Sequence, residues 1–92
     1  MWFRRMVFTG VADIKSVSVE KGQTIIFSCF TTNIRMATFE QDLADDMNNF
    51  MIPHDDGDKG LTPFRFVTDE TAVLYFRPDQ NTAATLTVMV LN

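Results

Sequence analysis

The run Thr85-Leu86-Thr87-Val88-Met89-Val90-Leu91, near the end of this 92-residue chain, places an apolar side chain at every second position. That spacing puts Leu86, Val88 and Val90 on one face of a β-strand. Two further runs, 25–30 and 72–77, are equally short and of the same character. Turn-forming residues lie between the runs, and this combination predicts a small antiparallel β protein.

The sequence predicts an all-β fold, a small antiparallel β-sandwich or jelly roll of six to seven strands. We expect the strands at 2–8, 13–19, 24–30, 34–38, 64–68, 72–77 and 84–91. The run 24–30 is apolar on both faces, which favours a central strand covered on both sides. The run 2–8 mixes apolar and charged residues on both faces, which favours a sheet edge or a place between subunits. The expected core contains Phe27, Phe66, Leu74, Phe76, Leu86 and Val88.

The stretch 39–50 is the one place where the apolar residues recur at the spacing of a helix instead of that of a strand. Its apolar residues at helical spacing are Phe39, Leu43, Met47 and Phe50. Asp45-Asp46 and Asn48-Asn49 are poor helix formers, which speaks against a helix. Two alternatives stay open, a short helix near 39–50 and an irregular loop.

The length of 92 residues predicts a single domain over 1–92. Nine Phe and six Met are many for so short a chain, and we expect some of them to face a neighbouring subunit. The lone cysteine, Cys29, excludes a disulfide within the chain. Its place inside a strand predicts a small buried hydrophobe.

The charge pattern bears on partners. The net charge is -4, and residues 36–60 hold seven acidic groups against one basic group. An acidic middle opposes binding to nucleic acid. No apolar run is long enough to span a membrane, and the start of the chain lacks the apolar region of a signal peptide. We therefore expect a protein that no signal peptide exports, cytoplasmic during synthesis.

One acidic loop, His54-Asp55-Asp56-Gly57-Asp58, is a candidate for chemistry. Neighbouring carboxylates around a glycine turn can bind Ca²⁺, and the candidate ligands are Asp55, Asp56 and Asp58. The alternative is a solvated loop that keeps the protein in solution. We identify no motif for catalysis, zinc or a phosphate group, and we expect no enzymatic activity and no cofactor unless Ca²⁺ binds.

Aromatic residues give the stronger functional lead. The candidate interface residues are Trp2, Phe3, Arg4, Arg5, Phe39, Leu43, Met47 and Phe50. Trp and Arg are typical anchors of protein interfaces, so the N-terminal segment predicts an arm that docks on a neighbour. The alternative is an ordinary first strand. Trp2 or Tyr75 could instead stack on a sugar ring.

The order of these signals resembles that of small β-sandwich accessory domains of the pre-peptidase C-terminal type. The pieces that carry the resemblance are residues 17–27, an acidic middle, 72–78 and 86–90. A free-standing sandwich with one cysteine also resembles the small decoration, head and tail proteins of bacteriophages. The resemblances imply a non-enzymatic structural protein, a capsid decoration, head or tail component of a virion. Its partners would be copies of itself, as a homo-oligomer, and other proteins of the particle. The alternative is a ligand-binding module that recognises carbohydrate or depends on Ca²⁺.

Overall fold

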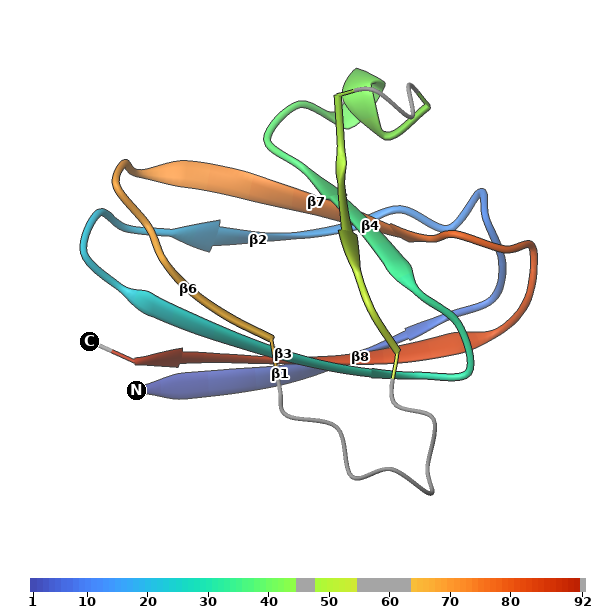
Figure 1. Cartoon of the computed structure of the whole chain (residues 1–92), viewed down its shortest axis with the longest axis horizontal. Helices are drawn as coiled ribbons and strands as arrows, with labels where there is room; N and C mark the ends of the chain where they lie inside the picture. The colour runs from blue at the N-terminus through green and yellow to red at the C-terminus, as the bar shows by residue number, and fades with distance from the viewer. Residues whose placement is uncertain (45–47, 55–63, 92) are drawn as a thin grey trace.

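The computed structural model describes residues 1–44, 48–54 and 64–91, which form eight strands and one short 3-10 helix (Figure 1). The elements are β1 (Trp2–Phe8), β2 (Lys15–Val19), β3 (Thr24–Phe30), β4 (Ile34–Ala37), η1 (Glu40–Ala44), β5 (Phe50–Ile52), β6 (Phe64–Val67), β7 (Ala72–Pro78) and β8 (Ala84–Leu91).

The strands pair as if the chain were one long hairpin that has been rolled up. β1 pairs with β8, β2 with β7, β3 with β6 and β4 with β5, all antiparallel. Rolling brings β3 against β8 and β4 against β7. The result is two sheets, sheet A in the order β1-β8-β3-β6 and sheet B in the order β2-β7-β4-β5. This strand order is that of an eight-stranded jelly roll, and the predicted all-β sandwich is confirmed.

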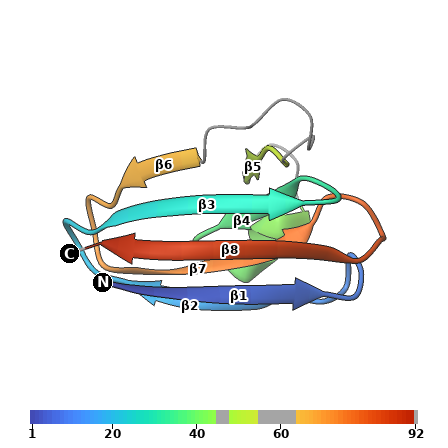
Figure 2. The ribbon, with the colours of Figure 1, turned by 90° about the horizontal axis from the view of Figure 1, so that it is seen from below.

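The core lies between the two sheets, which Figure 2 shows stacked one behind the other. Phe27 of sheet A meets Phe76 of sheet B edge to face, with 5.7 Å between ring centroids. Leu74, Leu86 and Val88 are buried beside them, as the sequence predicted. The side chain of Phe66, the sixth predicted core residue, lies outside the described part of the structure.

The structure refines three details of the predicted architecture. The described residues form eight strands, one more than the upper number predicted, because Phe50–Ile52 forms the short β5 against β4. Of the two alternatives left open for 39–50, a short helix is present, as the 3-10 segment Glu40–Ala44, and Phe50 at the end of the stretch belongs to a strand. The second strand begins at Lys15 rather than at Asp13.

The N-terminal segment is an ordinary first strand. β1 pairs along its whole length with β8 of the same chain, from Trp2 opposite Val90 to Phe8 opposite Ala84. Of the two alternatives for this segment, an arm that docks on a neighbour and an ordinary first strand, the structure has the first strand. β1 is nevertheless an edge strand of sheet A, as its mixed faces predicted. Any contact it makes with a neighbour must use its edge or its outward side chains.

Candidate functional site

The outer face of sheet A carries apolar side chains from all four strands of the sheet. Residues directly opposite each other in a sheet share a face, so the register gives the outward side chains row by row. They are Phe3, Arg5 and Val7 of β1, Thr85, Thr87, Met89 and Leu91 of β8, Thr24, Ile26, Ser28 and Phe30 of β3, and Val67 of β6. Figure 2 looks onto this face, which we call the outer face of sheet A.

Several large apolar side chains on this face are open to solvent. Phe3 is 67% exposed, Val67 63%, Val7 57% and Phe30 45%. Met89 connects Phe3 to Ile26 in one apolar row across three strands. A folded domain rarely leaves such a patch bare unless it binds something. The sequence analysis expected β3 to be covered on both sides, and this is wrong for its outer side, because no element of the described chain lies over it.

Two edge strands, β1 of sheet A and β2 of sheet B, each carry a cation at a core-facing position. Arg4 occupies a core-facing position of β1, and its guanidinium carbon lies 5.6 Å from the centre of the Trp2 ring. Lys15 occupies a core-facing position of β2. Its Nζ lies 5.9 Å from the centre of the Phe8 ring and 3.5 Å from Asp13 Oδ1. Charges that point inward on an edge strand oppose the addition of a further strand. The edges at β1 and β2 are thereby guarded against pairing with a further strand.

Asp13 also closes the loop between β1 and β2. The Thr9 backbone N–H donates to Asp13 Oδ2 at 2.9 Å, and Lys15 lies on the other carboxylate oxygen. The hydrogen bond from Thr9, helped by the charge of Lys15, holds the pKa of Asp13 below its usual value of 3.8.

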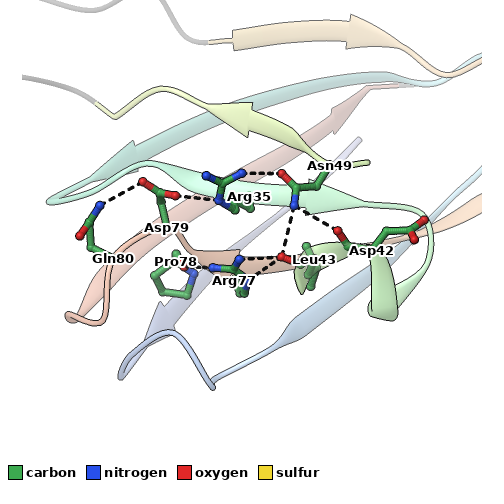
Figure 3. A network of polar contacts seen from close by, with 8 residues as sticks. All are labelled: Arg35, Asp42, Leu43, Asn49, Arg77, Pro78, Asp79 and Gln80. Atoms are coloured by element: carbon green, nitrogen blue, oxygen red, sulfur yellow. Dashed lines mark hydrogen bonds and ion pairs between the residues drawn. The ribbon is translucent and has the colours of Figure 1, made fainter. Parts of the chain in front are cut away.

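The outer face of sheet B is covered differently, by η1 and a network of polar contacts (Figure 3). Arg35 of β4 and Arg77 of β7 stand directly opposite each other on this face. Arg35 donates to Asp79 Oδ1 and to Asn49 Oδ1, both at 2.7 Å. Asn49 in turn donates to the carbonyl oxygens of Asp42 at 3.1 Å and Leu43 at 3.2 Å. The Arg35 guanidinium therefore has two acceptors of its own, although the like-charged Arg77 stands opposite it.

Arg77 fastens η1 to the sheet. Its Nε and Nη2 donate to the Leu43 carbonyl oxygen at 2.9 and 2.6 Å, and its Nη1 donates to the Pro78 carbonyl oxygen at 2.9 Å. The Leu43 side chain is buried, outside the main core cluster. A hollow remains beside this fastening, lined by Val11, Ile14, Glu40, Gln41, Leu43, Ala44 and Arg77.

The predicted interface residues lie in different places in the fold. Phe3, Arg4 and Arg5 of β1 are exposed, whereas Trp2 is half-buried and packs against the core. Phe39 and Phe50, on the sheet B side, are 63% and 45% exposed. Leu43 is buried within the protomer, so it offers no surface to a neighbour. Met47 lies outside the described residues.

Sequence reasoning missed the apolar residues on the outward positions of β3 and β8, although they were visible as a second apolar face. It also missed the contacts of Arg77, because its partner Leu43 is 34 positions away in the chain.

The candidate calcium ligands, Asp55, Asp56 and Asp58, lie outside the described residues. Within the described ranges no three side chains of His, Cys, Asp or Glu come together in a way that could hold a metal ion.

Cys29 is buried, as predicted, and its thiol donates to the Pro53 carbonyl oxygen at 3.2 Å. The His54 ring meets the Asn33 side-chain oxygen at 2.6 Å. None of the helical segments in the described part of the chain has the length and apolar character needed to cross a membrane.

Comparison of the chain with protein-family models, with curated proteins and with solved structures returns no match.

Proposed function

We propose that this protein is a non-enzymatic building block of a larger protein particle and that it buries the outer face of sheet A against a neighbouring copy. The observation that carries this proposal is the set of four exposed apolar side chains on that face, Phe3, Val7, Phe30 and Val67. Each of them, once buried, stabilises an interface by roughly 1–2 kcal/mol.

The size of the face sets the strength of the contact. Four strands about 4.8 Å apart and a longest strand of eight residues give, with side chains at the margins, on the order of 500 Å² per protomer. Two such faces bury about 1,000 Å², the lower end of specific interfaces. A contact of this size is weak between two free molecules. It becomes strong when each copy makes several contacts, as in a closed particle.

A virion component is the form of this proposal that we favour, namely a phage capsid decoration, head or tail protein. Jelly rolls are one of the architectures from which viral capsids are built, and the support is an analogy of fold. The guarded edges at Arg4 and Lys15 support it further, because a chain packed at high local concentration must not add strands without control.

The alternative of a carbohydrate-binding or Ca²⁺-dependent module has less support. Trp2 packs against the core beneath Arg4, so its ring is not an open platform for a sugar.

Sedimentation velocity from about 10 μM to about 1 mM tests the proposal. We expect the wild-type chain to form larger species with rising concentration, and the Phe3→Glu variant to stay monomeric with an unchanged circular dichroism spectrum. Phe50→Glu is the matched control, an exposed Phe on the sheet B side, and should associate like wild type. A wild-type chain that stays monomeric at about 1 mM contradicts the proposal, and so does association that Phe50→Glu abolishes and Phe3→Glu does not.

A further inference from the structure

The outer face of sheet A carries a charge that a symmetric contact would leave unpaired. Arg5 lies between Phe3 and Val7 on this face. Among the described residues the Arg5 guanidinium has no hydrogen-bond or ion-pair partner, and the outward residues of sheet A include no acid in the described part of the chain. Two such faces packed on each other would remove both Arg5 side chains from water without a carboxylate, which is costly. The surface that receives this face should therefore be acidic.

The other side of the sandwich offers a carboxylate beside an apolar hollow. The hollow beside η1 is lined by the apolar residues Val11, Ile14 and Ala44 and by Glu40. Its volume is about 510 Å³, which lies in the range of small-ligand pockets and is ample for one side chain. Phe39, next to Glu40, is exposed.

One charged side chain that lines the hollow has no partner in the described part of the chain. No residue in the described ranges forms a hydrogen bond or an ion pair with the Glu40 carboxylate. Arg77 also lines the hollow, but it is bound to the carbonyl oxygens of Leu43 and Pro78. Arg35, its neighbour, is paired with Asp79. Glu40 is thus the charge lining the hollow that remains to be paired, as Arg5 is on the outer face of sheet A.

We propose that copies of this chain associate head to tail, with the outer face of sheet A of one copy seated on the η1 side of the next. In this arrangement Phe3 enters the hollow and Arg5 pairs with Glu40. Phe3 and Arg5 are two positions apart on one strand face, hence about 7 Å apart, so one partner can engage an apolar pocket and a carboxylate that lines it together.

A head-to-tail contact uses two different surfaces, and it builds rings when the rotation closes and filaments when it does not. This inference rests on the proposed function, because it names the surface that the outer face of sheet A meets.

Two variants, each disabling one surface, test the arrangement. The double variant Phe3→Glu, Arg5→Glu disables the sheet A surface. The double variant Ala44→Trp, Glu40→Lys fills the hollow and reverses the charge at position 40. We expect each variant alone to be monomeric at concentrations where wild type associates. Mixed in equal amounts, they should form a dimer of one copy of each and nothing larger, since one intact face then meets one intact hollow. A hollow variant that dimerises by itself, or a mixture that stays monomeric, overturns the head-to-tail contact.

Charge reversal gives a second measurement, which does not depend on filling the hollow. Arg5→Glu and Glu40→Lys should each raise the dissociation constant about tenfold or more, and both together in one chain should restore it to within about threefold of wild type. Lys21→Glu and Glu70→Lys are the controls, because they make the same charge changes on exposed turn residues and should have little effect. Failure of the double reversal to restore binding contradicts the pairing of Arg5 with Glu40.

The outcomes separate the two proposals. Wild-type association that Phe3→Glu abolishes, without dimer formation in the mixture, leaves the proposed function standing and removes the head-to-tail contact. A wild-type chain that never associates removes both.

Discussion

Replacing Arg77 by Met should detach η1 from sheet B and lower the stability of the fold. The guanidinium donates twice to the Leu43 carbonyl oxygen and once to the Pro78 carbonyl oxygen. A hydrogen bond with a charged partner contributes about 1.5–3 kcal/mol. Because Arg77 is half-buried and two donors share one acceptor, we count the anchor as about 2 kcal/mol.

One opposing effect reduces this figure. Arg35 stands directly opposite Arg77, and removing one of two like charges relieves about 0.5 kcal/mol of repulsion. The relief is small because Asp79 lies 2.7 Å from Arg35. The net loss is about 1.5 kcal/mol, which lowers the melting temperature of a domain this size by about 6–12 °C.

Urea and thermal unfolding of Arg77→Met at low micromolar concentration, followed by Trp2 fluorescence and circular dichroism, measure this loss. Arg5→Met is the control, since it removes an exposed cation without a partner, and should change stability by less than about 0.5 kcal/mol. Leu43→Ala should cost at least about 2 kcal/mol, and the double variant should cost less than the sum because η1 detaches once. An Arg77→Met variant as stable as wild type, or strict additivity with Leu43→Ala, refutes the anchoring role.

Three further substitutions act on the backbone and on pH dependence. Thr31 has a φ of 83°, which strains a β-branched residue, so Thr31→Gly should stabilise the fold by about 1 kcal/mol in urea unfolding. Gly22 has a φ of 90° with open space around it, so Gly22→Ala should destabilise by about 1 kcal/mol through backbone strain alone. Asp13 has a lowered pKa in the folded state, so its contribution to stability is complete above its ordinary value of 3.8 and is lost as the pH falls through the folded value. Asp13→Asn should therefore lose less stability than wild type between about pH 4 and about pH 2, measured as urea midpoints, and an identical loss would contradict the assignment.

The strands of this fold could be predicted because each carries its own local signal. The alternation in residues 85–91 reports one buried face of β8, and Leu86, Val88 and Val90 are buried there. The positive φ of Gly22 could be anticipated from its place in a turn. β5 could not be predicted in this way, because a strand of three residues, Phe50–Ile52, is too short to show a period and is defined by its pairing with β4.

The candidate site could be predicted only in part, for a related reason. Alternation tells which residues share a face but not whether the chain itself covers that face. The apolar outward side of β3, with Ile26 and Phe30, was interpreted as covered. In the fold Phe30 is exposed and Ile26 is only half-buried on this side. The contacts of Arg77 depend on a partner far away in the sequence, and no local pattern reports such a contact.

In the proposed assembly, the rolled topology links binding of a neighbour to folding. Phe3, Val67 and Met89 come from the start, the later half and the end of the chain, and only pairing of β1, β6, β8 and β3 brings them onto one face. An unfolded chain therefore presents no equivalent surface, and a neighbour binds the native state alone. Binding of that kind stabilises by RT ln(1 + [L]/Kd), about 2.7 kcal/mol at a hundredfold excess over Kd. For a small domain, whose own core gives limited stability, this is a large share of the total. Under the proposed function, exposure of the outer face of sheet A is therefore a cost to the free protomer that a neighbouring copy would remove.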